Sequence, residues 1–195
     1  MFPVGNHLSP WEFSASVFGG PDAGDLSVKI QRDKTVITLG RTDDLNADAD
    51  KLRRWRCGRI VMQNGRLVEV QHRLLCGNVS VAQVWWQASY GRSDESVCWL
   101  DYHQPLGMPA FLTLDYIRSG KQAGYKTFIG AVKVLEQIAK IRQSVAIVAH
   151  VTNGNISDRF LSRIGWQQHM PNWKGRHWIR RFYDGYPDDH LHRYA

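Results

Sequence analysis

The chain has few cysteines, and their arrangement argues against two classes of small protein. Only three of its 195 residues are cysteine, Cys57, Cys76 and Cys98, and no pair has Cys-x-x-Cys spacing. An odd, unclustered set is typical neither of a disulfide framework nor of a zinc knuckle, so we expect buried thiols. His190 and His192 have no acidic or thiol partner at ligand spacing, and no metal site is expected.

Long apolar runs are absent as well. No stretch approaches the roughly 18 consecutive apolar residues of a membrane span. The opening "MFPVGNHLSP" has neither the basic nor the apolar region of an export signal. The sequence therefore predicts a cytoplasmic protein without a membrane partner, and it does not indicate an oligomeric state.

Acidic residues are outnumbered by basic ones, 18 against 25, which gives a formal net charge of +7. This excess favours an anionic partner, which is a nucleic acid, an acidic protein or a cofactor that carries phosphate. The basic residues are spread over "KLRRWR", "RSGKQAGYK" and "KGRHWIRR". Because they are not gathered in one tail, a basic cleft is favoured over a disordered nucleic-acid arm.

The N-terminal half reads as an arm followed by strands. Residues 1–24 are rich in proline and glycine without periodicity, which predicts an irregular arm, and residues 25–195 form one domain. Alternating polarity predicts a hairpin over 26–40, and acids followed by bases predict a helix around 44–56. Asn64-Gly65 predicts a second hairpin. Further strands are expected within 79–89, 96–103 and 110–117.

The C-terminal half alternates helices with strands. After the basic glycine loop "RSGKQAG", apolar residues at steps of three and four predict a helix over 125–143. The β-branched run "SVAIVAHV" predicts a buried strand. A short helix over 156–164, ended by Gly165, and a last strand "RHWIRRFY" follow.

This order of elements suits a pyrophosphate site. In a loop before a helix, a glycine admits the ligand to the backbone, amide groups point at phosphate oxygens, and the helix dipole adds positive charge. The segment from Lys121 to Lys126, with Thr127 opening the helix, has this composition. The later segment from Ser157 to Trp166 follows this loop at the distance along the chain that is expected for a second helix of the same site.

With these two segments, residues 110–183 resemble the general N-acetyltransferase (GNAT) superfamily. Lys121 and Gly124 match its pyrophosphate loop, and Ser157 and Gly165-Trp166 match its later helix. The resemblance implies an α/β fold of the α+β type, with a mixed, mostly antiparallel sheet flanked by helices, that binds acetyl-CoA or another acyl-CoA. The cofactor-binding residues that it implies are Tyr116, Ile117, Arg118, Lys121, Gln122, Ala123, Gly124, Tyr125, Lys126, Thr127, Asn153 and Asn155.

The chain departs from the family pattern in three ways. Asn153 and Asn155 lie on either side of the place where the family has an asparagine, so either of them could serve. Lys126 stands where a second small residue is usual, so its side chain either contributes charge to the phosphate site or obstructs it. Leu161 stands where many members have the tyrosine that protonates the leaving thiolate, and leucine has no proton to donate.

Two acids and one histidine are the candidates for catalysis. Asp115 lies near the end of the strand that enters the loop, where a carboxylate can act as a base through water. His103 and Asp101 alternate on one strand face as a candidate base and orienter. We expect acyl transfer from acyl-CoA to an amine whose identity is open. The alternative is a non-catalytic GNAT-like module that binds nucleic acid, the less favoured partner, or an acidic protein.

Overall fold

A single mixed sheet forms the framework of the molecule. The computed structural model describes residues 13–14, 38–74, 96–152, 154 and 156–187. The strands are β1 (Phe13–Ser14), β2 (Thr38–Thr42), β3 (Cys57–Gln63), β4 (Arg66–Arg73), β5 (Val97–His103), β6 (Phe111–Ser119), β7 (Ala146–His150), β8 (Gln167–Gln168) and β9 (His177–Arg181), and the helices are α1 (Ala49–Arg54), α3 (Tyr125–Ile141) and α4 (Asp158–Arg163).

The strands follow the order β2-β4-β3-β5-β6-β7-β9-β8, with β1 paired to β6. Within the described residues, β6 and β7 are the parallel pair and the other pairs are antiparallel. The parallel pair is joined through α3, because parallel strands need a crossover connection. The expected α+β class with a mostly antiparallel sheet is confirmed.

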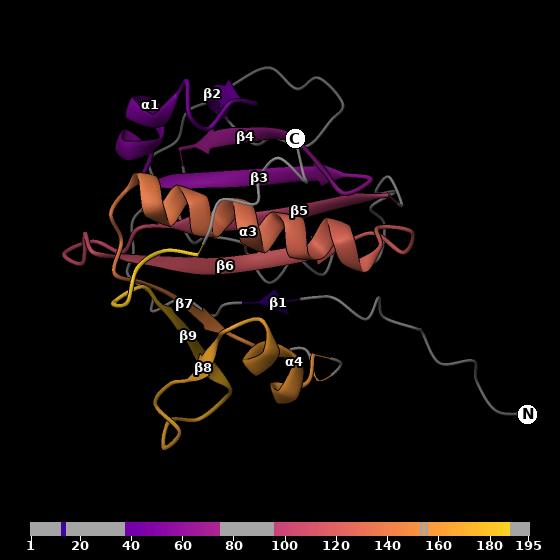
Figure 1. The fold of residues 1–195 in the computed structure, drawn as a ribbon, viewed down its shortest axis with the longest axis vertical. Coiled ribbons are helices and arrows are strands. Elements are labelled where there is room, and N and C mark those ends of the chain that lie inside the picture. The colour runs from indigo at the N-terminus through magenta and orange to yellow at the C-terminus, as the bar shows by residue number, and fades with distance from the viewer. Residues whose placement is uncertain (1–12, 15–37, 75–95, 153, 155, 188–195) are drawn as a thin grey trace, which may run out of the picture.

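Helix α3 covers one face of the sheet (Figure 1). Alternate residues of the central strands, such as Ile60, Met62 and Leu100, are fully buried in the same core as Leu135 and Ile138 of α3. Because side chains alternate along a strand, the residues between them lie on the opposite face. That opposite face carries the polar residues of the candidate site.

Local sequence signals account for several element ends. Asn64 and Gly65 have φ angles of 51° and 78°, the left-handed pair that a tight β3–β4 hairpin needs. Gly165, at φ 86°, ends α4, and the Ser157 hydroxyl caps its start by accepting from the amide of Phe160. The predicted hairpin and both predicted C-terminal helices are confirmed.

Helix α1 is shorter than predicted. It begins at Ala49 rather than near residue 44, because the Asp44 carboxylate accepts hydrogen bonds from the amides of Asn46 and Ala47 and holds a turn there. Arg142, at the end of α3, donates to the carbonyls of Leu52 and Trp55 and ties α1 to α3.

Strand β6 has two irregularities at the same place. Its pairing with β5 shifts between Asp101↔Tyr116 and Tyr102↔Leu114, so that Asp115 is the extra residue of a β-bulge. Its parallel pairing with β7 runs from Phe111↔Ala146 to Leu114↔Ala149. Strand β6 continues to Ser119, so β6 and β7 part at the bulge.

The cysteines differ from expectation. Cys57 is disulfide-bonded, whereas Cys98 is a free, buried thiol. The expectation of thiols is therefore wrong for Cys57. Whether two cysteines pair depends on how closely their Cα atoms approach in the fold, which spacing along the chain does not reveal.

Several expectations fall outside the described residues. They are most of the arm over 1–24, the first part of the hairpin over 26–40, the strand within 79–89, Asn153, Asn155, His190 and His192. No helix in the described part of the chain is both long and apolar enough to cross a membrane.

Candidate active site

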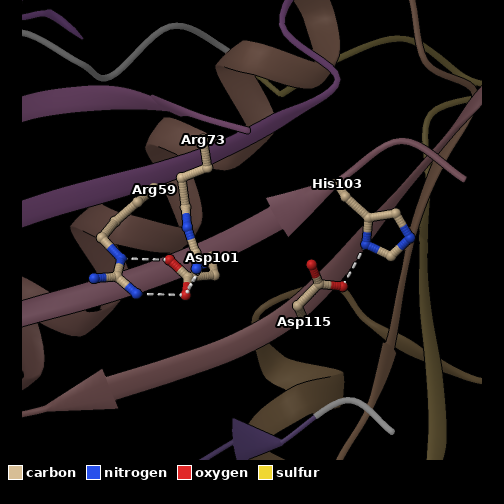
Figure 2. A network of polar contacts seen from close by, with 5 residues as sticks. All are labelled: Arg59, Arg73, Asp101, His103 and Asp115. Atoms are coloured by element: carbon tan, nitrogen blue, oxygen red, sulfur yellow. Dashed lines mark hydrogen bonds and ion pairs between the residues drawn. The ribbon is translucent and has the colours of Figure 1, made fainter. Parts of the chain in front are cut away.

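A histidine and an aspartate meet at the bulge. His103 is the last residue of β5, and its Nδ1 lies 2.5 Å from Oδ1 of Asp115 on β6 (Figure 2). The Asp115 side chain is 5% exposed and that of His103 is 17% exposed. With Nδ1 as the donor to the carboxylate, Nε2 is left as the proton acceptor. Both residues were candidates on sequence, and the fold brings them together.

The predicted partnership of His103 with Asp101 is wrong. Asp101 does lie on the same strand face, but its carboxylate is taken by two arginines. Nε and Nη2 of Arg59 donate to Asp101 at 2.6 and 2.8 Å, and Nη1 of Arg73 donates at 2.6 Å (Figure 2). Residues two apart on a strand are further apart than cross-strand neighbours, and the bulge turns Asp115 toward His103 instead.

The surroundings of Asp115 shift the pKa of its carboxyl. Burial raises the pKa of Asp115 above its ordinary value, and the hydrogen bond and charge of His103 act against this. The negative charge of Asp101 also raises the pKa, while the positive charge of Arg73 lowers it. A buried carboxyl with a raised pKa beside a histidine is an arrangement typical of acid-base sites.

The predicted phosphate loop leads into the first turn of α3. The helix begins at Tyr125, where the periodicity predicts its start and two residues before Thr127, and Gly124 is its N-cap without a side-chain hydrogen bond. Lys121, Gln122, Gly124, Tyr125 and Lys126 are exposed, Arg118 is partly exposed, and Tyr116, Ile117, Ala123 and Thr127 are buried. The exposed residues are therefore the ones available to a ligand.

Nothing in the fold requires a glycine at position 124. Its φ of −65° is open to any residue, and an added Cβ would meet no atom within 4 Å. By contrast, Gly165 has φ 86°, and the Arg180 guanidinium occupies the place that an added Cβ would take. The missing side chain at Gly124 keeps space open in front of the α3 amides.

Lys126 does not fill that space. Its side chain packs on the β3–β4 hairpin, where Cδ lies 2.9 Å from the Cβ position of Gly65. Of the two interpretations of Lys126, obstruction of the phosphate site finds no support in this arrangement. Its exposed ammonium group is available to an anion.

A small apolar hollow lies on the α3 side of the parting strands. It is lined by side chains that include Leu114, Phe128, Ala149, Leu161 and Trp166, and its free volume is about 10 Å³. That volume is roughly one water molecule. Leu161 is 2% exposed and belongs to the core, so this position contributes packing and not a proton.

Strand β1 lies along the edge of β6 just past the bulge. Phe13 pairs with Ile117 and Ser14 with Tyr116. The backbone of β6 next to Asp115 is therefore paired with β1, at two of the residues that the resemblance implies for cofactor binding.

Arg59 and Arg73 are site residues that sequence reasoning missed. The alternation of β3 places Arg59 on the same face as Asp101, directly across the β3–β5 pair, so pairing the two strands correctly would have indicated it. Arg73 lies on β4, two strands from Asp101, and only the folded sheet indicates it.

No metal centre is present in the described ranges, since no three His, Cys, Asp or Glu side chains gather there as ligands. Comparison with known proteins found no matching family model, no matching curated protein and no matching solved structure.

Proposed function

We propose that the protein is an acyl-CoA-dependent N-acyltransferase of the GNAT type. The observation that carries the proposal is the His103–Asp115 pair, formed at a bulge where two parallel strands part. A strand, a basic loop and a long helix run from this point to a second strand, so the parting strands and the open N-terminus of α3 belong to one unit.

The pair can serve as the base for an amine. Nε2 of His103 accepts the proton of the attacking amine, and the Asp115 carboxylate stabilises the imidazolium that results. Backbone amides of residues 115–117 are the candidates for holding the oxyanion. The described site has no tyrosine at position 161 to act as an acid, so the proposal assigns protonation of the leaving thiolate to solvent.

Acyl-CoA supplies an activated acyl group through its thioester, whose C–S bond breaks as the new C–N bond forms. The residues that would hold its phosphates are the exposed part of the loop and first helical turn, namely Lys121, Gly124, Tyr125 and Lys126. The fit rests on Gly124, whose missing side chain the fold leaves unexplained, and on a first helical turn without an acidic residue.

The test combines binding with turnover. Acetyl-CoA at a hundredfold excess over Kd should stabilise the folded chain by about 2.7 kcal/mol, which a melting curve detects. Release of free CoA in the presence of a panel of amines should then identify an acceptor, and His103→Gln should lower kcat at least a hundredfold, the lower range for general-base catalysis.

The failure of either arm has a defined meaning. An unchanged melting temperature at millimolar acetyl-CoA and low salt would contradict the proposal. Binding of acetyl-CoA without release of free CoA for any amine would favour the non-catalytic module.

A further inference from the structure

Three histidines lie next to one another where β7, β9 and β8 meet. His150 is the last residue of β7 and pairs directly with His177, the first residue of β9. The amide of His169, just after β8, donates to the carbonyl of His177 at 2.8 Å. They form a second group of titratable side chains, on strands other than the β5 and β6 of the candidate active site.

The rings of His150 and His177 stack on each other. Their centroids are 4.6 Å apart and their planes are 14° from parallel. Because directly paired residues of two strands point to the same face, the strand pairing holds the rings together. Two neutral imidazoles, or one neutral and one charged, can share this stack, whereas two charged rings at such a distance repel each other. The closed stack therefore disfavours a second proton.

The β8–β9 connection, residues 169–176, is fastened through the His177 ring (Figure 1). Nε2 of His177 donates to the carbonyl of Lys174 at 3.0 Å, since a carbonyl oxygen only accepts. The indole of Trp173 meets the same ring edge-on, with centroids 5.7 Å apart. Both contacts hold the connection to the start of β9.

The same connection packs against His150. Gly175 has φ 104°, and the His150 ring occupies the place that an added Cβ would take. The amide of Val151, the residue after His150, donates to the carbonyl of Arg176 at 2.8 Å. The connection is thus attached to the end of β7 at the place where His150 stacks on His177.

The charged groups around the stack are mainly basic. The titratable groups that neighbouring elements contribute include Lys174 and Arg176 in the connection, His169 after β8, Arg181 on β9, Asp158 on α4 and Asp115 on β6. Arg176 binds Asp158, and His103 binds Asp115. A second proton on the stack therefore meets little compensating negative charge from these groups.

We propose that the stacked His150–His177 pair is a pH-sensitive latch: while at most one ring is charged it holds the β8–β9 connection on the end of β7, and protonation of both rings releases the connection. The latch rests on the ring stack, on the hydrogen bond to Lys174 and on the packing of His150 against Gly175. It does not depend on the proposed acyl transfer.

The pKa values of two of the histidines give the direction of the effect. Burial, and then the charge of His177, lower the pKa of His150 below its ordinary 6.5. Burial, and then the charges of Arg181 and His177, lower the pKa of His169. In the released form these rings regain ordinary pKa values, so that form binds more protons. Release therefore grows as the pH falls from 6.5 through the lowered pKa values, and it levels off below them.

Hydrogen exchange of backbone amides in the 195-residue chain tests the latch. Protection factors, which correct for the pH dependence of the intrinsic exchange rate, are measured by NMR between about pH 8 and about pH 5, where histidine titrates. The amide of Val151 reports release, because its acceptor is the carbonyl of Arg176 in the connection. Amides within α3 report global unfolding. The ring signals of His150 and His177 show when each ring gains its proton.

The protection of the Val151 amide should fall at least about tenfold over this range, and that of the α3 amides less than about threefold. One linked proton changes an opening equilibrium by up to about tenfold per pH unit. His177→Gln keeps a donor for the Lys174 carbonyl but does not take up a proton, so the fall should shrink to about threefold or less. His150→Gln should give the same result.

His72→Gln is the matched control. The His72 ring stacks on Trp55, and burial lowers its pKa too, but it lies on β4, near the other end of the strand order. This variant should keep the wild-type fall in Val151 protection. Circular dichroism and melting curves at about pH 8, above the titration of histidine, establish that each variant is folded.

The wild type alone can overturn the inference, if the protection of Val151 does not fall or falls only together with that of α3. A folded His150→Gln or His177→Gln that keeps the full wild-type fall would also overturn it. So would a His72→Gln that loses the fall.

Discussion

At the scale of single residues, the bulged Asp115 is the position where folding and chemistry conflict. A buried carboxyl is desolvated, and its pKa is raised from the ordinary value of 3.8. The folded chain therefore retains a proton over a pH window in which the unfolded chain has lost it. Functional sites commonly contain residues that lower the stability of the fold, and an ionised Asp115 is such a residue.

This conflict predicts how stability depends on pH. The stabilising effect of protonated Asp115 is fully present below pH 3.8, the ordinary pKa of the carboxyl. It is lost as the pH rises through the raised pKa of the folded chain. Asp115→Asn keeps an oxygen that accepts from His103 but does not titrate. The free energy of unfolding of this variant minus that of wild type should rise with pH across the window and then level off. Urea unfolding at closely spaced pH values measures it, and a difference that falls with pH would contradict the expected sign.

At the scale of elements, the start of α3 combines a good helix with a poor cap. Gly124 has no side chain that could accept a hydrogen bond from the first helical amides, and the first turn has no acidic residue to complement the helix dipole. The helix is held by its buried face, which includes Phe128, Val134, Leu135 and Ile138, so it does not depend on its first turn. The N-terminus is thereby free to present amides to an anion.

A serine at position 124 separates stability from binding. Serine is a better N-cap than glycine by a few tenths of a kcal/mol, and the backbone and the space both admit it. Gly124→Ser should therefore keep or slightly raise the melting temperature, yet weaken acetyl-CoA binding at least tenfold, because its side chain competes for the α3 amides. Calorimetry provides the affinities.

Lys126→Ala is the matched control in the same helical turn. It should weaken binding only a few-fold and reduce its salt dependence, as expected for an exposed charge screened over about 10 Å at 0.1 M salt. If Gly124→Ser binds acetyl-CoA as tightly as wild type, the loop is not the phosphate site.

At the scale of the whole molecule, segments far apart in the chain meet at β6. The N-terminal strand β1 pairs with Tyr116 and Ile117, β5 contributes His103, and β7 parts from β6 after Ala149. The backbone that the proposal assigns to the oxyanion thus lies beside β1. Under the proposal, a ligand bound at this edge therefore competes with β1.

That competition is measurable. Proline has no amide hydrogen and does not fit a paired strand, so Phe13→Pro and Ser14→Pro should each weaken β1 pairing. If β1 covers the ligand edge of β6, only the molecules in which β1 is detached can bind, and the apparent affinity is reduced by that fraction. These variants should therefore bind acetyl-CoA more tightly than wild type. Weaker binding with an unchanged fold would mean that β1 supports the site rather than covering it.

Elements that obey local rules can be predicted from the sequence. Asn64-Gly65, the periodicity of α3 and Gly165 each act over a few residues, so their effect is visible in the chain. Asp115 and His103 were both found as candidates. Their meeting depends on the fold, because a bulge depends on the register of two strands. The fold alone also brought Arg73 across β3 and β1 onto β6, since contacts between distant segments leave no local pattern.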